Sequence, residues 1–164
     1  MEHPIYQKDY AAWHALKSTL DSDTRLPTFA KREIWWCSTG VNVGVEQDGK
    51  NRFFERPVLI VRKFNKRLFW GVPLTSKRKD WPYRYTIHYK AKNETAAKER
   101  QLLLLQLRAY DAARLLRPIV KLSSHQFIGI SEALAALLLE PASVKNSAAP
   151  KGGVVPSGKV ITDV

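Results

Sequence analysis

Hydrophobic positions near the start of the chain predict a short helix. Over residues 6–20 the apolar side chains recur at the spacing of one helical face. They are Tyr6, Tyr10, Trp13 and Leu16–Leu20. The segment 21–27, with its Asp and Pro residues, ends this helix. The apolar stripe leaves two roles open, packing on the rest of the protein or binding a partner.

Apolar, aromatic and β-branched runs bounded by turn residues then predict a series of strands. They cover residues 33–38, 56–63, 67–74, 84–90, 102–107 and 115–122. Ser123 or Ser124 can cap a final helix. One face of that helix carries Phe127, Ile130, Leu134, Leu137 and Leu138. Periodicity alone therefore predicts a mainly β fold with α, and short strands followed by a helix favour a small antiparallel barrel of the SH3-like kind.

Composition divides the chain into three parts. Residues 1–30 form an N-terminal helical extension, and residues 31–140 form the main domain. Pro, Gly, Ser, Ala and Lys dominate residues 141–164, so we expect a disordered C-terminal tail. The formal net charge is +12, of which residues 1–30 carry −1, residues 31–140 carry +11 and the tail carries +2. A basic excess within the folded part favours a polyanionic partner.

The remaining bulk features exclude several classes of protein. The lone Cys37 rules out an internal disulfide or a multi-cysteine metal site, and its aromatic strand predicts a small buried hydrophobe. No apolar run approaches the ~18 residues of a membrane span. The first residues lack the basic start and apolar stretch of a secretory signal. We therefore expect a cytoplasmic protein with no membrane partner.

Candidate chemistry gathers around one predicted hairpin. The polar loop 40–54 carries Glu46-Gln47, the next strand opens with Arg56-Pro57, and the strand after it ends in Thr75-Ser76. A loop of this length in a compact domain is more often functional than idle. An arginine, a carboxylate and two hydroxyls at strand ends are suited to handling a phosphate group.

The register of this hairpin brings two of these residues together. If Asn65 and Lys66 are the turn residues, Phe64 faces Arg67, and the same pairing places Arg56 opposite Thr75. Facing side chains in an antiparallel pair have Cβ atoms about 4.5–5.5 Å apart. A three-residue turn or a bulge shifts the register by one and separates the two side chains. The arginine and the hydroxyl are thus expected on one face at the open end.

These segments resemble the toxin family of MazF, PemK and Kid, over roughly residues 32–139. The resemblance rests on Glu46-Gln47, on Arg56-Pro57, on Val72-Pro73-Leu74-Thr75, on the strand 33–37 and on Gln106-x-Arg108-x-x-Asp111. It implies a CcdB/MazF-like SH3-like barrel that forms a homodimer. It also implies the toxin of a type II toxin–antitoxin pair, bound by an acidic antitoxin and contacting DNA only through the antitoxin complex.

The implied activity is metal-independent, sequence-selective cleavage of single-stranded RNA or mRNA, with no cofactor. The ribose 2′-OH attacks the phosphorus, leaving a 2′,3′-cyclic phosphate and a 5′-OH. Arg56 suits the charge on phosphate oxygens, Thr75 matches the family's catalytic threonine, and Ser76 can add a donor. Glu46 can either accept the proton or orient Arg56.

A wider set of residues is expected to bind the RNA itself. Basic side chains can hold its backbone, and an aromatic ring can stack a base. The set comprises Gln47, Lys50, Arg52, Lys77, Arg78, Lys79, Trp81, Gln106 and Arg108.

Two departures from the family pattern keep a second hypothesis open. Some members carry a histidine where this chain has Val45 and an aspartate where it has Leu105. The alternative is therefore a catalytically weak SH3-like module that binds RNA or a protein. Poisoning of DNA gyrase, as by CcdB toxins, is less favoured because the motifs are those of the nucleases.

Overall fold

The computed structural model describes residues 7–139. The predicted tail 141–164 and residues 1–6 lie outside this range. In chain order the elements are α1 (Tyr10–Ser22), β1 (Glu33–Ser38), β2 (Glu55–Lys63), β3 (Leu68–Thr75), β4 (Arg84–Tyr89), β5 (Lys98–Leu103), η1 (Leu104–Gln106), β6 (Arg108–Asp111), η2 (Ala112–Arg114), β7 (Leu115–Lys121) and α2 (Ser124–Leu138). Within the described range, no helix has both the length and the apolar character needed to cross a membrane.

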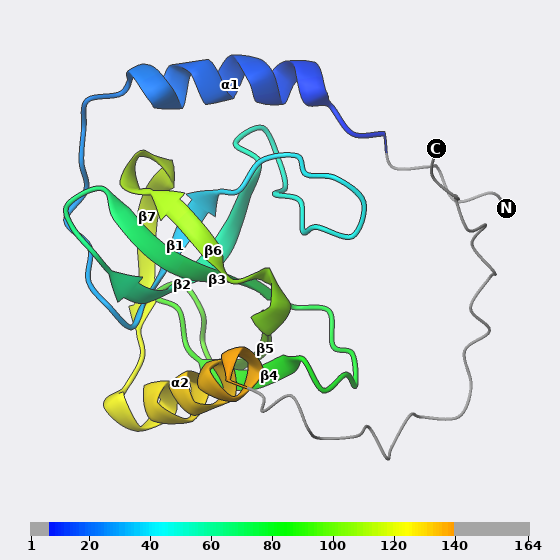
Figure 1. The fold of residues 1–164 in the computed structure, drawn as a ribbon, viewed down its shortest axis with the longest axis vertical. Helices are drawn as coiled ribbons and strands as arrows, with labels where there is room; N and C mark the ends of the chain where they lie inside the picture. Colours follow the sequence, from blue (N-terminus) through cyan, green and yellow to red (C-terminus); the bar gives the residue numbers. More distant parts are fainter. Residues whose placement is uncertain (1–6, 140–164) are drawn as a thin grey trace, which may run out of the picture.

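The strands form one antiparallel sheet in the order β4-β5-β3-β2-β1-β7, with β6 paired to β3. α1 and α2 lie at opposite ends of the molecule, and the loop between β1 and β2 lies below α1 (Figure 1). In the described part of the chain, no pairing joins the edge strands β4 and β7. The mainly β fold with two helices is confirmed, whereas the predicted closed barrel is not.

Two clusters of buried apolar side chains form the core of the domain. The larger one joins the sheet to α2 through Phe127, Ile130 and Leu134, which are three of the five positions predicted for the helical face. Leu138, also predicted there, is largely exposed. The second cluster includes Phe69 and Tyr110, whose rings stack with centroids 5.5 Å apart. The two clusters fix the strand ends on which the candidate site is built.

The β2–β3 hairpin reaches the predicted register by a different route. Its turn has three residues, 65–67, because the backbone N–H of Phe64 donates to the Leu68 carbonyl. A bulge at Val61 then shifts the register back. Val58 consequently pairs with Pro73, the last pair of this ladder, and the same register continued for two steps would set Arg56 opposite Thr75. The predicted two-residue turn is therefore wrong. The register beyond Ile60 is nevertheless the predicted one, because the bulge offsets the extra turn residue.

The strand predicted over residues 102–107 is also corrected. β5 starts at Lys98 and ends at Leu103, and the chain continues through the short helix η1 into β6, which the hydrophobic pattern missed. The charged start of β5 is tolerated because its polar side chains have partners. Arg100 donates to Glu94, and Gln101 bonds the main chain of Lys79. Polar contacts to the two neighbouring loops thus stabilise the start of this strand, where the sequence has no apolar run.

The N-terminal helix begins later than predicted, at Tyr10 instead of residue 6. Asp9 is its N-cap, and its carboxylate accepts a hydrogen bond from the Ala12 N–H. No residue of α1 is buried, although Trp13, Leu16 and Leu20 are partly covered. The helix is therefore held by a few side-chain contacts rather than by a core of its own.

Burial of Cys37 makes a simple test of the fold. This thiol is fully buried in β1, and burial raises its pKa to about 12. Since the thiolate is the reactive form, we expect no reaction with a thiol reagent such as DTNB at pH 8 in the native protein. One equivalent should react after denaturation in urea. Rapid reaction of the native protein would contradict this packing of β1.

Candidate active site

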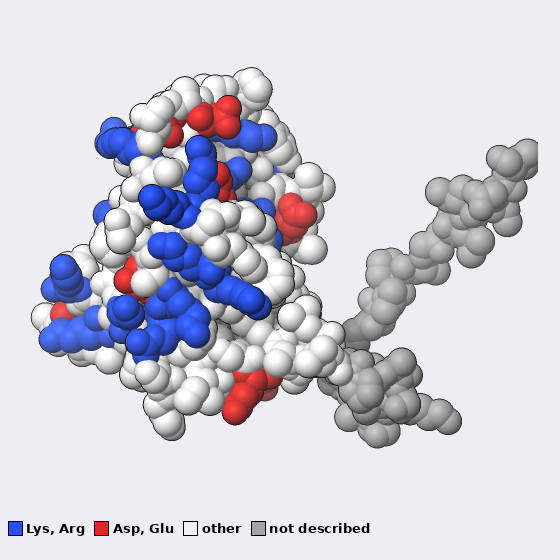
Figure 2. Space-filling model, turned by 60° about the vertical axis from the view of Figure 1, so that its left-hand side comes forward, with Lys and Arg blue, Asp and Glu red and all other residues white. Residues whose placement is uncertain are grey.

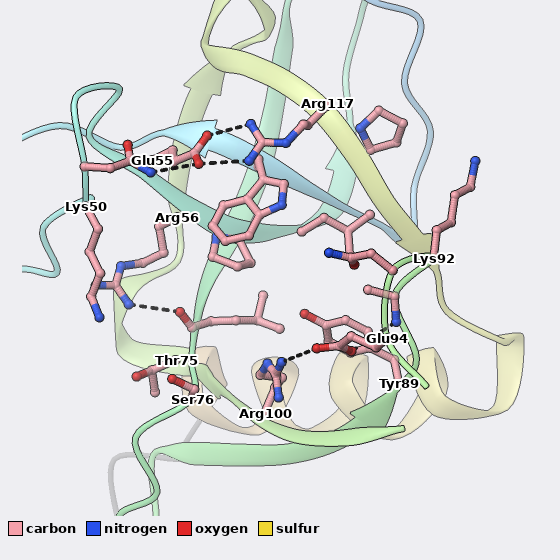
Figure 3. Close-up of a pocket in the computed structure, with 18 residues that line it drawn as sticks. Lys50, Glu55, Arg56, Thr75, Ser76, Tyr89, Lys92, Glu94, Arg100 and Arg117 are labelled. Atoms are coloured by element: carbon pink, nitrogen blue, oxygen red, sulfur yellow. Dashed lines mark hydrogen bonds and ion pairs between the residues drawn. The ribbon is translucent and has the colours of Figure 1, made fainter. Parts of the chain in front are cut away.

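A basic cavity of about 570 Å³ opens at the ends of β2 and β3. Its lining side chains converge from the loop 50–51, from β2 and β3, and from the region 89–100 (Figure 3). Five are basic and two are acidic: Lys50, Arg56, Lys92, Arg100 and Arg117, with Glu55 and Glu94. This excess of positive charge in a concave site favours an anionic ligand.

Arg56 is the buried cation of this cavity, with 8% of its surface exposed. Its Nε donates to the Asp48 carbonyl at 2.8 Å and its Nη1 to the Leu74 carbonyl at 3.1 Å. Nη2 has no partner within the described residues and is not enclosed. Burial lowers the pKa of this guanidinium, while the nearby Asp48 opposes that shift. One nitrogen of a fixed, charged fork therefore remains for a ligand oxygen.

Thr75 and Ser76 lie beside Arg56 in the same cavity (Figure 3). Thr75 has 8% of its surface exposed, and its Oγ1 accepts a hydrogen bond from the Lys77 N–H at 3.1 Å. Its own hydroxyl proton is free to point toward a ligand. Ser76 is exposed at the rim. The structure thus brings together the arginine and both hydroxyls that the sequence singled out.

A buried acid of the site was missed by the sequence analysis. Glu55 precedes Arg56, is 5% exposed, and forms a two-pronged ion pair with Arg117 at 2.8 and 2.9 Å. Asn51 donates to the same carboxylate at 2.9 Å. Burial pushes the pKa of Glu55 upward, but the hydrogen bonds from Arg117 and Asn51 outweigh it and lower the pKa overall. Glu55 is therefore held ionised.

A second pair, also missed, closes the opposite side of the cavity. Arg100 donates to Glu94 at 3.0 Å, and Lys98 approaches the same carboxylate at 3.1 Å. Tyr89 lines the cavity next to them, and burial raises its pKa. No local pattern in the sequence predicts the Glu55–Arg117 or Glu94–Arg100 pair, although Glu94 and Lys98 are four residues apart. Both acidic residues of the cavity, Glu55 and Glu94, consequently form ion pairs with basic side chains.

Six of the predicted residues line a different cavity of about 690 Å³. They are Glu46, Gln47, Lys79, Trp81, Gln106 and Arg108. The carboxylate of Glu46 accepts from the Val43 N–H within its own loop. The Arg56 cavity does not include Glu46, and the recorded partners of Arg56 are main-chain carbonyls. An orienting bond from Glu46 to Arg56 is thus not formed in this structure.

The pair Gln106 and Arg108 holds the β1–β2 loop instead of standing free. Gln106 accepts from the Gln47 N–H and donates to the Val45 carbonyl. Arg108 donates to the Asn42 side chain and to the Thr39 carbonyl. These contacts span about sixty residues of sequence, so the sequence alone could not reveal them. They make the loop part of the rigid framework.

The remaining predicted RNA contacts are exposed around the cavities. Arg52 stacks over the Phe53 ring, Lys77 has no ion pair among the described residues, and Arg78 lies 3.7 Å from Glu99. Lysine and arginine atoms spread over the face in Figure 2, with few acidic atoms between them. The basic excess predicted for residues 31–140 therefore forms a broad surface, suited to an extended polyanion.

The family model of the PemK-like, MazF-like toxins of type II toxin–antitoxin systems matches residues 30–138. This match covers more than half of the chain, so the protein belongs to this family of toxins. The resemblance carried by the Glu-Gln, Arg-Pro and Val-Pro-x-Thr segments is thereby confirmed.

Solved structures support the same fold. MazF from Deinococcus radiodurans is 19% identical with a TM-score of 0.52, covering 70% of this chain and 97% of that chain. An endoribonuclease from Mycobacterial species, solved with its cognate antitoxin, is 15% identical with a TM-score of 0.51, covering 70% and 98%. At these identities the likeness shows the fold alone. A search of curated proteins finds no match.

The Glu55–Arg117 pair predicts a pH-dependent stability. Because the folded pKa of Glu55 lies below its ordinary value, the pair stabilises the fold above that value, and this is lost as the pH falls through the folded pKa. Arg117→Met leaves the buried acid without its main partner, so we expect a loss of roughly 1–3 kcal/mol at pH 7. The loss should shrink toward pH 4 in urea unfolding.

The matched control for Arg117 is Lys121, which lies on the same strand. Its ammonium is 3.9 Å from Glu33, and the two basic side chains are about equally exposed, but Glu33 is 22% exposed where Glu55 is 5% exposed. Lys121→Met should cost less than about 1 kcal/mol, as exposed pairs usually do. Equal losses for the two variants at all pH values would contradict the role of the buried Glu55.

Proposed function

We propose that this toxin is a metal-independent, sequence-selective endoribonuclease that cleaves single-stranded RNA or mRNA. The observation that carries the proposal is the buried Arg56, which keeps one free guanidinium nitrogen beside the Thr75 hydroxyl in a basic cavity. The structurally similar Mycobacterial protein is named an endoribonuclease. A binding partner for the toxin follows from its family, and we propose an acidic antitoxin.

The residues of the cavity meet the electrostatic needs of this reaction. The ribose 2′-oxygen attacks phosphorus while the bond to the 5′-oxygen breaks, and negative charge builds on the non-bridging oxygens. Arg56 and Thr75 donate to these oxygens, with Ser76 as a further donor. Because Arg56 is already fixed by two carbonyls, little reorganisation is needed when the charge develops. We also propose that Arg56 delivers the proton to the leaving 5′-oxygen, a role secondary to its stabilisation of charge.

The proton of the 2′-OH needs an acceptor, and two carboxylates are candidates. Glu46 is exposed and its loop borders the second cavity. Glu55 lies in the Arg56 cavity but is tied to Arg117. An RNA phosphate that takes over Arg117 frees Glu55 to act as the base. With either carboxylate the protons balance, because Glu46 or Glu55 takes one from the 2′-oxygen and Arg56 gives one to the 5′-oxygen.

The second cavity is our proposed site for neighbouring nucleotides. Trp81 is 48% exposed and its ring meets that of Tyr83 edge to face, which leaves a surface for a base. Lys77, Arg78 and Lys79 link this cavity to Thr75 along the chain and can hold phosphates. We also propose an SH3-like arrangement of the strands, a homodimer and a cytoplasmic site of action, with DNA contacted only through the antitoxin.

One observation favours a weaker second function. In the described chain, both acids of the Arg56 cavity are neutralised by arginines, and Glu46 bonds its own loop. A cavity in which no carboxylate is free to accept a proton can still bind RNA or a protein, but it would cleave RNA only slowly. The alternative is therefore a catalytically weak binding module on the same surface.

The first experiment compares variants on a long single-stranded RNA in EDTA. Arg56→Ala and Thr75→Ala each remove a donor to the transition state, and we expect a fall in kcat of roughly 10²-fold or more. Wild type should give discrete cuts with 5′-OH ends. Arg62→Ala is the matched control, because Arg62 is exposed on the same strand and lies outside the cavity. Cleavage that survives Arg56→Ala would refute the assignment, and RNA bound intact by wild type would favour the binding module.

The proton acceptor is assigned by a separate pair of variants. Glu46→Gln and Glu55→Gln each remove a base with little change in size, so the true acceptor should lose roughly 10²–10⁴-fold in kcat. The other variant should retain most of its turnover. Single-turnover cleavage from pH 5 to 9 provides the measurement. If neither variant slows cleavage, neither carboxylate accepts the proton.

A further inference from the structure

We propose that the segment 8–22 clamps the β1–β2 loop, so that Lys8, just before α1, and Trp13, within α1, position Arg56 from outside the toxin domain. This inference rests on the proposed function for its effect on turnover. α1 precedes the family match, which begins at residue 30. The clamp is therefore a feature of this chain's own N-terminal extension.

The first contact is an ion pair between Lys8 and Asp48. The Lys8 ammonium lies 3.2 Å from the Asp48 carboxylate, and both side chains are mostly covered, at 23% and 14% exposed. Lys8 also donates to the Asn42 carbonyl, and the other Asp48 oxygen accepts from the Asn42 N–H at 2.6 Å. The lysine thus joins both ends of the loop segment 42–48.

The ion pair reaches the catalytic arginine through one residue. The side chain of Asp48 binds Lys8, and its main-chain carbonyl accepts from Arg56 Nε at 2.8 Å. A shift of Asp48 must therefore move the acceptor that fixes the guanidinium. Lys8 acts on Arg56 only through Asp48 and is a positioning residue.

The second contact is the ring of Trp13. It meets the Phe54 ring edge to face at 5.6 Å and lies under the Arg114 guanidinium at 5.4 Å. Gly40 gives it room, because a Cβ at Gly40 would lie 2.4 Å from the indole. Residues 40 and 54 are the two ends of the β1–β2 loop, so one side chain of α1 covers both.

The loop needs such an anchor because its backbone is strained. Phe54 has a φ of 46°, in a region that bulky side chains rarely adopt, whereas Asn51 has a φ of 56°, which asparagine tolerates. Such conformations persist where the surrounding structure determines them. The chain turns tightly over residues 51–54, and a short bridge pairs Lys50 with Glu55 on either side of this turn. Loss of the contact between Trp13 and Phe54 would therefore loosen the turn that presents Lys50 and Glu55 to the cavity.

The weak anchoring of α1 makes the proposal testable without unfolding the domain. No residue of α1 is buried, and neither apolar cluster of the domain includes Trp13. Substitutions at Lys8 and Trp13 should therefore leave the sheet and the thermal unfolding of the domain nearly unchanged. Their effect should be confined to the loop and to Arg56.

The experiment uses the full chain with Lys8→Met and Trp13→Ala. The controls are Lys17→Met and Tyr10→Ala, which change an exposed charge and an exposed ring on the same helix. We expect both clamp variants to raise amide hydrogen exchange across residues 39–54 at least fivefold and to lower kcat for RNA roughly tenfold or more. Lys8→Arg keeps the ion pair and should restore both values, while the controls stay near wild type.

Two readouts separate this inference from the proposed function. If wild type does not cleave RNA, hydrogen exchange in the loop still tests the clamp, and faster exchange in Lys8→Met but not Lys17→Met supports it. Unchanged exchange in both clamp variants overturns it, even if Arg56→Ala shows that the protein is a nuclease. Faster exchange with unchanged or increased turnover overturns the positioning of Arg56. Failure of Lys8→Arg to restore either value overturns the role of the ion pair.

Discussion

The site depends on the burial of one guanidinium at the open end of the β2–β3 hairpin. A buried charge is costly unless its donors are satisfied, and Arg56 meets this need with two main-chain carbonyls rather than with a carboxylate. The carbonyls orient the guanidinium but do not neutralise it. The cation therefore keeps its full charge for a ligand, and it can do so only while Asp48 and Leu74 stay in place.

The β1–β2 loop supplies one of those carbonyls, and it is held by side chains from three directions. Arg108 in β6 and Gln106 in η1 hold it from the domain, and Asn42 and Asp48 close it on itself. Lys8 and Trp13 meet it from the N-terminal extension. These bonds satisfy a polar backbone that has almost no ladder partners of its own. As a result, Gln106 and Arg108, which were expected to contact RNA, are part of the framework.

Charge in the two cavities follows from the same arrangement. In the Arg56 cavity each acid is paired with an arginine, Glu55 with the distant Arg117 and Glu94 with the nearby Arg100, so the basic excess remains while each acid fixes its partner. In the second cavity, aromatic rings and apolar side chains stand next to fewer charges. A polyanion with bases, as proposed, finds phosphate-binding groups in one cavity and stacking surfaces in the other.

The sequence by itself determined the strands with strong hydrophobic patterns, the capped helix α2 and the family, whereas it placed Arg56 near Thr75 through a turn that the structure does not contain. These features depend on neighbours in the chain or on the pairing of adjacent strands. The two-residue turn and the strand at residues 102–107 were wrong because local geometry and polar contacts to neighbouring loops outweighed the pattern. Tertiary structure alone decided that Glu55 pairs with Arg117, that Glu46 lies in another cavity, and that Lys8 reaches Asp48. Each of these contacts joins residues dozens of positions apart, and such contacts form only when packing of the whole domain brings them within bonding distance.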